Sequence, residues 1–77
     1  MSRMPTITAK VMIAFLADQG FMKVRQKGSH KFFKHADGRT CVVPDHRGED
    51  LGRGITVKIL NDIELTRDDL MEWLGAR

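Results

Sequence analysis

The chain has 77 residues, a net charge of +3 and one cysteine, Cys41. This length predicts a single domain over residues 1–77, with residues 1–5 as a loose N-terminus, and leaves little room for a deep substrate cavity. One cysteine excludes an internal disulfide and a zinc site built from several cysteines. Since no apolar run reaches the roughly 18 residues of a membrane span and no signal peptide is apparent, we expect a soluble cytoplasmic protein.

Charge is unevenly distributed along the chain. Residues 21–40 carry six cations and one carboxylate, a balance of +5, whereas residues 61–77 carry five carboxylates and two arginines, a balance of −3. A basic middle and an acidic end indicate one face that binds a polyanion and another that is turned away from it. Ordinary solvated charge is the alternative at this point.

The first predicted element is a helix over about residues 8–19. Thr8 is suited to the N-cap, Ile7 before it can pack against Met12, and Gly20 is placed to end the helix in the left-handed conformation. The apolar side chains that recur at helical spacing are Val11, Met12, Phe15 and Leu16.

Two hairpins are expected to follow. Gly28-Ser29 suits a two-residue type II′ turn, and Asp37-Gly38 suits a two-residue type I′ turn. The opposed pairs that these turns predict are Lys27 and His30, Arg25 and Phe32, Val24 and Phe33, Phe33 and Val42, and Phe32 and Val43.

These pairs divide the predicted sheet into two faces. The face that the first helix can cover carries the core residues Met22, Val24, Phe33 and Val42. The other face carries Lys23, Arg25, Lys27, His30, Phe32, Lys34 and Cys41. It places Lys23 opposite Lys34, and two like charges that repel each other are typical of a surface that binds phosphates. Two solvated side chains that splay apart are the alternative.

The remaining chain predicts a loop and two helices. Pro44 ends the third strand, residues 55–61 form a second helix, and Thr66 begins a third, with Asp69 at the capping-box position. The order is therefore α-β-β-β-α-α. It predicts an α+β domain in which helices cover one face of a three-stranded antiparallel sheet.

One histidine among the cations has the properties that RNA cleavage requires. RNA carries its own nucleophile, the ribose 2′-hydroxyl, and a histidine can accept or donate the proton near neutral pH. His30 has Arg25, Lys27 and Lys31 nearby to neutralise a phosphate. The Gly28-Ser29 turn offers a close backbone approach and a hydroxyl donor, and Phe32 can stack on a base. A surface histidine without a role is the alternative.

No metal ligand pattern or cofactor motif is present. His35 lies on the opposite predicted face from His30, and the spacing of these two histidines and His46 matches no metal site. We expect no metal and no cofactor.

The segment GFMKVRQKGSHKFFKHADGRTCVVPDHRGEDLGRGITVKIL resembles the HicA toxins of toxin–antitoxin systems. The resemblance covers about residues 8–75. It is carried by the motifs Gly20-Phe21, Arg25 to His30, Asp37-Gly38-Arg39, Val43-Pro44-Asp45-His46, and Arg53-Gly54 before Ile59-Leu60.

The resemblance implies a double-stranded-RNA-binding-like fold and a metal-independent endoribonuclease that cleaves mRNA and is restrained by a HicB-type antitoxin. It implies that His30 is catalytic, and that His46 is either a second acid/base or a loop-stabilising residue. Cys41 is interpreted as structural, and no membrane partner is expected. The residues assigned to RNA binding are Lys23, Arg25, Lys27, Gly28, Ser29, Lys31, Phe32 and Lys34. A non-catalytic RNA-binding module and an inactive relative that binds an antitoxin are the alternatives.

Overall fold

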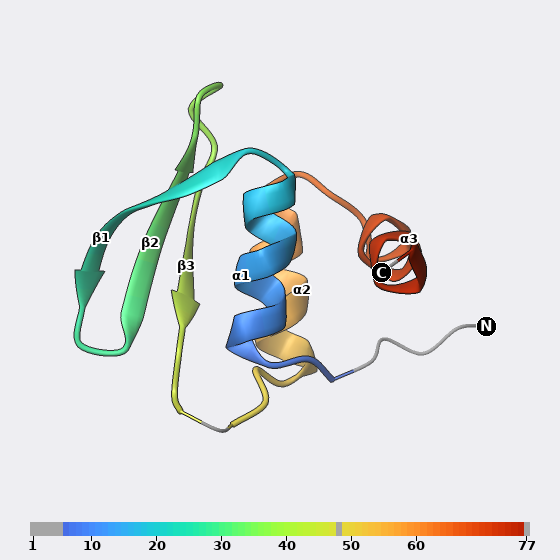
Figure 1. The fold of residues 1–77 in the computed structure, drawn as a ribbon, viewed down its shortest axis with the longest axis horizontal. Coiled ribbons are helices and arrows are strands. Elements are labelled where there is room, and N and C mark those ends of the chain that lie inside the picture. The colour runs from blue at the N-terminus through green and yellow to red at the C-terminus, as the bar shows by residue number, and fades with distance from the viewer. Residues whose placement is uncertain (1–5, 48, 77) are drawn as a thin grey trace.

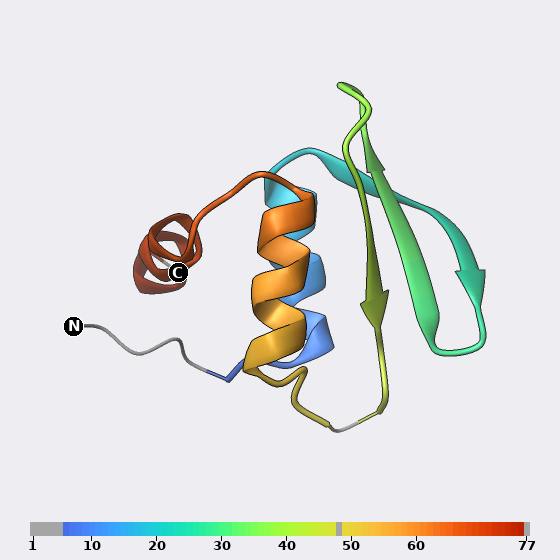
Figure 2. The ribbon, with the colours of Figure 1, turned by 180° about the vertical axis from the view of Figure 1, so that it is seen from behind.

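The computed structural model describes residues 6–47 and 49–76, so the N-terminal residues 1–5, expected to be loose, lie outside it. The elements in chain order are α1 (Ala9–Asp18), β1 (Phe21–Lys27), β2 (His30–His35), β3 (Thr40–Pro44), α2 (Arg53–Asp62) and α3 (Arg67–Ala76). The strands form one antiparallel sheet in the order β1-β2-β3. Helices α1 and α2 lie on the same side of this sheet (Figures 1 and 2). The predicted α+β fold and element order are confirmed.

Local capping residues define the helix ends as predicted. The Thr8 hydroxyl accepts a hydrogen bond from the Val11 N–H at 3.2 Å, and Gly20 follows α1 with a φ of 94°. Thr66 and Asp69 form a reciprocal capping box, because each side chain accepts from the other residue's N–H, at 2.8 and 3.1 Å. Helix α2 begins at Arg53, two residues before the predicted start.

The first hairpin has the predicted turn and an unpredicted bulge. Lys27 pairs with His30 across the turn, and Gly28 has the positive φ, 60°, that a type II′ turn requires at its first position. Arg25 pairs with Phe32 as predicted, but the register shifts between Lys23 and Arg25. The pairs beyond this bulge are Lys23 with Phe33, Met22 with Lys34, and Phe21 with His35. The predicted pairing of Val24 with Phe33 and the predicted opposition of Lys23 and Lys34 are therefore wrong.

The second hairpin has a three-residue loop in place of the predicted two-residue turn. His35 donates its N–H to the Arg39 carbonyl at 2.8 Å, and Gly38, with a φ of 101°, donates to the His35 carbonyl at 2.9 Å. A turn followed by a residue with positive φ is typical of three-residue hairpin loops. The Asp37 carboxylate stabilises this loop by accepting from the Arg39 backbone N–H at 3.1 Å and from the Arg39 Nε at 2.8 Å. These bonds lower the pKa of Asp37.

The bulge and the longer loop each shift one strand by one residue, and a shift of one residue exchanges the two faces. Phe33 now pairs with Cys41. The buried residues on the inner face, which is turned toward α1 and α2, are Phe21, Phe33, Cys41 and Val43. Met22, Val24 and Val42, predicted in the core, are exposed, and Cys41, predicted on the other face, is buried. The observed register is favoured because β3 buries Cys41 and Val43 together, whereas the predicted register would turn the polar Thr40 inward with Val42 and Pro44.

The outer face of the sheet is turned away from α1 and α2. Directly opposed residues share a face, so the pairs of β1 with β2 and of β2 with β3 define its members. These are Met22, Arg25, Lys27, His30, Phe32, Lys34, Thr40, Val42 and Pro44. The bulge residue Val24 has no opposed partner, but it lines a groove together with Arg25, Phe32 and Val42 of this face.

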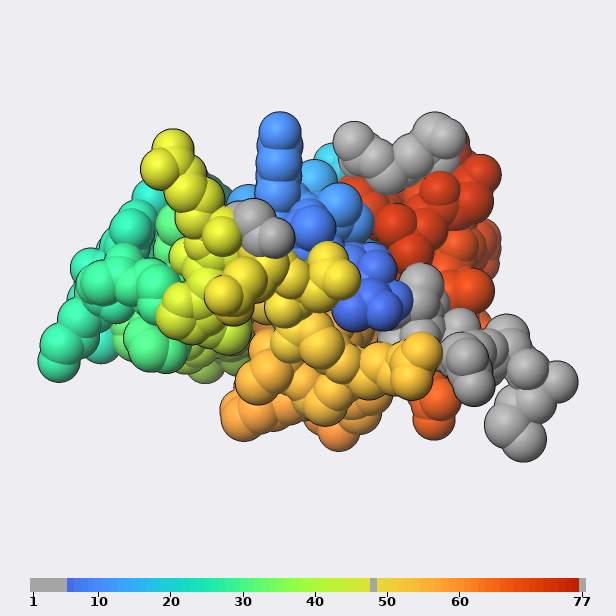
Figure 3. Space-filling view, turned by 90° about the horizontal axis from the view of Figure 1, so that it is seen from below, coloured from blue at the N-terminus to red at the C-terminus, as the bar shows by residue number. Residues whose placement is uncertain are grey.

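The residues that precede α1 and α2 are hydrogen-bonded to each other at one end of the molecule. Leu51 donates its N–H to the Ile7 carbonyl at 2.8 Å, and Thr8 forms an isolated antiparallel bridge with Asp50. Seen from below (Figure 3), the loop between β3 and α2 lies between the β1–β2 turn and the first residues of α1. The start of α2, the β3–α2 loop and the β1–β2 turn therefore meet at this end.

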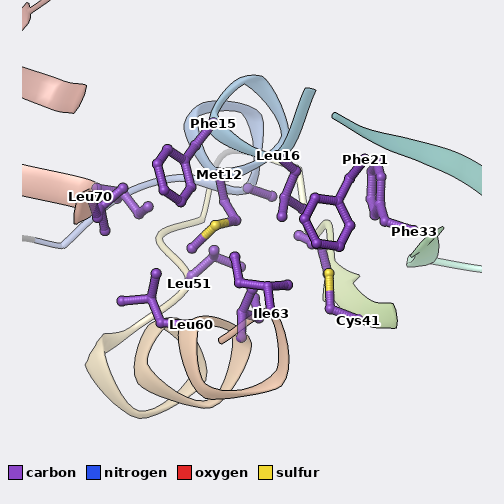
Figure 4. Packing of buried hydrophobic residues seen from close by; sticks show 14 residues of the cluster. Met12, Phe15, Leu16, Phe21, Phe33, Cys41, Leu51, Leu60, Ile63 and Leu70 are labelled. Carbon is purple, nitrogen blue, oxygen red and sulfur yellow. The ribbon is translucent and has the colours of Figure 1, made fainter. Parts of the chain in front are cut away.

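The core lies between the inner face and the helices (Figure 4). Its fully buried members include Met12, Phe15 and Leu16 of α1 and Leu60 of α2. Helix α3 adds its buried Leu70, and its Trp73 ring packs edge-on against Phe15, while the indole N–H donates to the Asp18 carboxylate at 2.7 Å. Burial raises the pKa of the Cys41 thiol to about 11, which supports the interpretation of Cys41 as structural.

Candidate functional site

A cavity of about 350 Å³ lies at the end of the molecule where the β3–α2 loop meets the sheet. It is lined by two of the three histidines in the chain. The complete set of lining residues is His30, Pro44, His46, Glu49, Asp50, Leu51 and Ile55. The cavity thus brings together two imidazoles and two carboxyl groups, all of which can accept or donate a proton.

His30 is positioned by the hairpin turn. It is the first residue of β2, and it lies directly opposite Lys27 on β1 and Pro44 on β3. Its side chain is exposed. The structure therefore places His30 beside a lysine on the outer face, as the first turn predicted.

His46 is positioned by its neighbour Asp45. The Asp45 N–H donates to the Ser29 carbonyl at 2.7 Å, and the Asp45 carboxylate accepts from the Lys31 Nζ at 2.6 Å. Within the loop, the His46 carbonyl accepts a hydrogen bond from the Glu49 N–H at 3.0 Å. These contacts attach the β3–α2 loop to the β1–β2 turn, and they explain why two histidines from separate segments share one cavity.

The residues assigned to RNA binding are divided between two sides of the sheet. Arg25, Lys27, Phe32 and Lys34 share the outer face with His30. The Arg25 guanidinium lies 4.4 Å from the centre of the Phe32 ring, so one face of this ring already has a cationic partner. Gly28 and Ser29 form the turn beside His30.

Lys23 and Lys31 belong to the other side of the sheet. Lys23 pairs with Phe33 on the inner face, and its Nζ donates to the Gln26 side chain at 3.2 Å. Lys31 pairs with Val43 and uses its ammonium group for the Asp45 carboxylate. The basic residues of the sheet thus do not form one continuous surface.

His35 is separated from the cavity. Its Nδ1 accepts from the Asp37 N–H at 3.1 Å, and its ring packs edge-on against Phe21 with centroids 5.0 Å apart. Among residues 6–47 and 49–76, no three histidine, cysteine or acidic side chains are arranged to hold a metal ion. Within the same residues, no helix is long and apolar enough to cross a membrane.

One known protein family matches most of the chain. The family described as the HicA toxin of bacterial toxin–antitoxin systems matches residues 9–65, which is more than half of the chain. The chain belongs to the HicA toxin family. No protein of curated function matches it significantly. Membership of the HicA family makes the chain a toxin of a toxin–antitoxin system and implies an antitoxin partner.

The site of this HicA-family chain contains acidic residues that the sequence interpretation did not assign. Asp45 holds the loop, and Glu49 and Asp50 line the cavity with the histidines. The position of Asp45 between Pro44 and His46 was the only available signal, since its partner Lys31 is 14 residues away. Glu49 and Asp50 gave no signal, because their spacing matches no known ligand loop.

Proposed function

We propose that this HicA-family toxin is a metal-independent endoribonuclease that cleaves mRNA with His30 as a catalytic acid/base, and that a HicB-type antitoxin restrains it. One observation carries the proposal: His30 and His46 line one cavity directly beside Lys27. RNA cleavage through the 2′-hydroxyl involves two proton transfers, one from the attacking 2′-oxygen and one to the departing 5′-oxygen, and a positioned side chain can carry out each of them. A cavity with two imidazoles meets that requirement without a metal ion.

The reaction follows from the chemistry of RNA. The ribose 2′-oxygen attacks the adjacent phosphorus, the bond from phosphorus to the 5′-oxygen breaks, and the products are a 2′,3′-cyclic phosphate and a free 5′-hydroxyl. One histidine accepts the proton of the 2′-hydroxyl, and the other donates a proton to the departing 5′-oxygen. Lys27 faces His30 across the turn and can hold the phosphate beside it, so we assign His30 one of these two proton transfers. His46 takes the second transfer.

RNA binding is assigned to the cations of the outer face. Arg25, Lys27 and Lys34 are exposed and lie on the same side of the sheet as His30. Each cation that contacts a phosphate releases counterions, which makes the affinity depend on salt. The Gly28-Ser29 turn fits close approach of the RNA backbone, because the space around Gly28 is open where a Cβ would be. Lys31 acts indirectly in this proposal, by holding Asp45 and the loop that carries His46.

A second function, RNA binding without cleavage, is favoured by one observation. Glu49 and Asp50 share the cavity with the two histidines, and carboxylates repel a phosphate. In that case the basic outer face would hold RNA, and neither histidine would transfer a proton.

Substitution of His30 separates the two functions. We expect His30→Ala to abolish growth arrest on expression in a host without the antitoxin, while the affinity for RNA stays within a fewfold of the wild type. Lys58→Ala on the exposed side of α2 is the matched control and should still arrest growth. Growth arrest by His30→Ala would contradict the catalytic role of His30. RNA binding by the wild type without any cleavage would favour the second function.

A further inference from the structure

The outer face of the sheet exposes an apolar groove that neither the fold nor the cleavage chemistry uses. Three large apolar side chains are open to solvent here. Val24, 60% exposed, and Val42, 37% exposed, line the groove, and Met22, 72% exposed, lies on the same face outside it. They are three of the four large exposed apolar side chains among residues 6–47 and 49–76. An exposed apolar patch of this kind typically marks a binding surface.

The groove has a volume of about 500 Å³, and it is distinct from the cavity that His30 and His46 share. Its lining residues are Val24, Arg25, Phe32, Phe33, Lys34, Thr40, Cys41 and Val42. In Figures 1 and 2 the helices of the described chain lie on the opposite side of the sheet, so none of them covers this groove. The β-bulge and the three-residue loop, which exchanged the faces of β1 and β3, account for its aliphatic surface.

The charges around the groove have one sign. Arg25 and Lys34 line it, and no lining residue is acidic. The three strands contain no aspartate or glutamate at all. A complementary occupant therefore carries carboxylates together with apolar groups.

The groove fits a polypeptide better than a nucleic acid. The large apolar side chains of its lining that are exposed, Val24 and Val42, are aliphatic and offer no ring on which a base can stack. Of its two phenylalanines, Phe33 is buried, and the half-buried Phe32 already has the Arg25 guanidinium over one ring face, 4.4 Å from the ring centre. Addition of a strand at the edge of β1 is disfavoured as well, because the bulge at Val24 interrupts that edge.

We infer that the outer-face groove binds an acidic amphipathic segment of the antitoxin, with apolar side chains against Val24 and Val42 and carboxylates against Arg25 and Lys34. This inference rests on the proposed function only for the identity of the partner as an antitoxin. The groove lies on the same face as His30, so a chain bound there sits beside the path that RNA takes to the cavity. Inhibition then needs no contact with either histidine.

Substitutions that change no charge distinguish between a protein and RNA as the occupant of the groove. One probe is a purified HicB-type antitoxin, and a second probe is a single-stranded RNA. Met22→Gln, Val24→Thr and Val42→Thr together remove apolar surface and leave every charge in place. We expect this triple variant to bind the antitoxin at least tenfold more weakly and to bind RNA within twofold of the wild type. Unchanged antitoxin affinity would overturn the inference, and so would a loss of RNA affinity alone, which would place nucleic acid in the groove.

A labelling experiment tests the same surface with one introduced cysteine, which leaves the rest of the groove unchanged. Cys41 is buried and its thiol pKa is raised to about 11, so a cysteine introduced on the surface is the one that iodoacetamide labels rapidly at pH 8. We expect the antitoxin to slow labelling of Val24→Cys at least tenfold and to leave the matched control Lys10→Cys, on α1, unaffected. Equal labelling of Val24→Cys with and without the antitoxin would refute the assignment.

Antitoxin affinity and cysteine labelling can both be measured whether or not the protein cleaves RNA. If the wild type binds the antitoxin through Val24 and Val42 but never cleaves RNA, the groove assignment stands and the proposed nuclease function fails. If the wild type cleaves RNA and the antitoxin inhibits it without protecting Val24→Cys, the nuclease function stands and the groove assignment fails.

Discussion

The ion pair between Lys31 and Asp45 connects the stability of the fold to the position of His46. Its atoms lie 2.6 Å apart, and the two side chains are 24% and 27% exposed. A charge-assisted hydrogen bond contributes about 1.5–3 kcal/mol, whereas a fully exposed ion pair contributes about 0–1 kcal/mol. Because this pair is about one quarter exposed, we expect Asp45→Asn to lower the free energy of unfolding by about 1–2 kcal/mol. Asp62→Asn is the matched control, since its pair with Lys58 is 71% and 37% exposed.

Urea denaturation of a double-mutant cycle measures this coupling directly. The cycle consists of the wild type, Lys31→Met, Asp45→Asn and the double variant, and we expect a coupling energy of about 1 kcal/mol. The same cycle for Lys58 and Asp62 should give less than about 0.5 kcal/mol. A coupling energy for Lys31 and Asp45 no larger than that of the exposed pair would refute the reasoning.

The functional part of the prediction concerns RNA cleavage. In Asp45→Asn the β3–α2 loop keeps the backbone hydrogen bond from Asp45 to Ser29 but loses the ion pair. We expect the cleavage rate to fall at least tenfold at a temperature well below the unfolding midpoint, while RNA affinity stays within a fewfold. A folded Asp45→Asn variant that cleaves RNA at the wild-type rate would show that Lys31 and Asp45 do not position His46.

Three further predictions concern other parts of the chain. Because burial raises the pKa of the Cys41 thiol to about 11, native protein should react with Ellman's reagent at pH 8 at least 100-fold more slowly than protein unfolded in guanidinium; equal rates would contradict the buried position of Cys41. Gly20→Ala should destabilise the fold by about 1–3 kcal/mol in urea denaturation and more than Gly38→Ala, since both glycines have positive φ but only a Cβ at Gly20 would meet the His35 side chain, at 2.9 Å; equal losses would exclude that clash. Removing the three cations Arg25, Lys27 and Lys34 should weaken RNA binding and reduce the slope of log affinity against log salt by about 2, at about 0.7 per phosphate contact; an unchanged slope would place the RNA elsewhere.

The helices and the first turn were predictable because local interactions determine them. Thr8 and Thr66 cap helices through residues three positions along the chain, and Gly28 permits the tight turn through its own φ. These signals need no knowledge of the rest of the fold. They also placed His30 correctly, because it follows the turn directly.

The register of the two edge strands, β1 and β3, was not predictable from turn residues alone. Asp37-Gly38 matches the sequence of a two-residue turn, but the Asp37 side chain stabilises a longer loop through Arg39. On β1 the bulge at Val24 lets Phe21 enter the core while Arg25 remains opposite Phe32. Both outcomes depend on burial against the helices, which is a tertiary effect.

The candidate site was partly predictable for the same reason. The turn identifies His30, but the shared cavity with His46 depends on contacts of Asp45 with Ser29 and Lys31 that link separate strands. The strand register also divides the cations between the two faces of the sheet, since Lys23 and Lys31 lie on the inner side. Sequence patterns therefore found the catalytic candidate and overestimated the extent of the basic face.

The most direct test of the central claim, that two histidines cleave RNA through its own 2′-hydroxyl, is cleavage of a defined RNA by purified, antitoxin-free protein in the presence of EDTA. The account predicts that the wild type produces 2′,3′-cyclic phosphate and 5′-hydroxyl ends, that 2′-O-methyl substitution at the cleaved nucleotide blocks the reaction, and that His30→Ala is inactive although it still binds the RNA. Cleavage of the 2′-O-methyl RNA, or cleavage by His30→Ala at the wild-type rate, would contradict it.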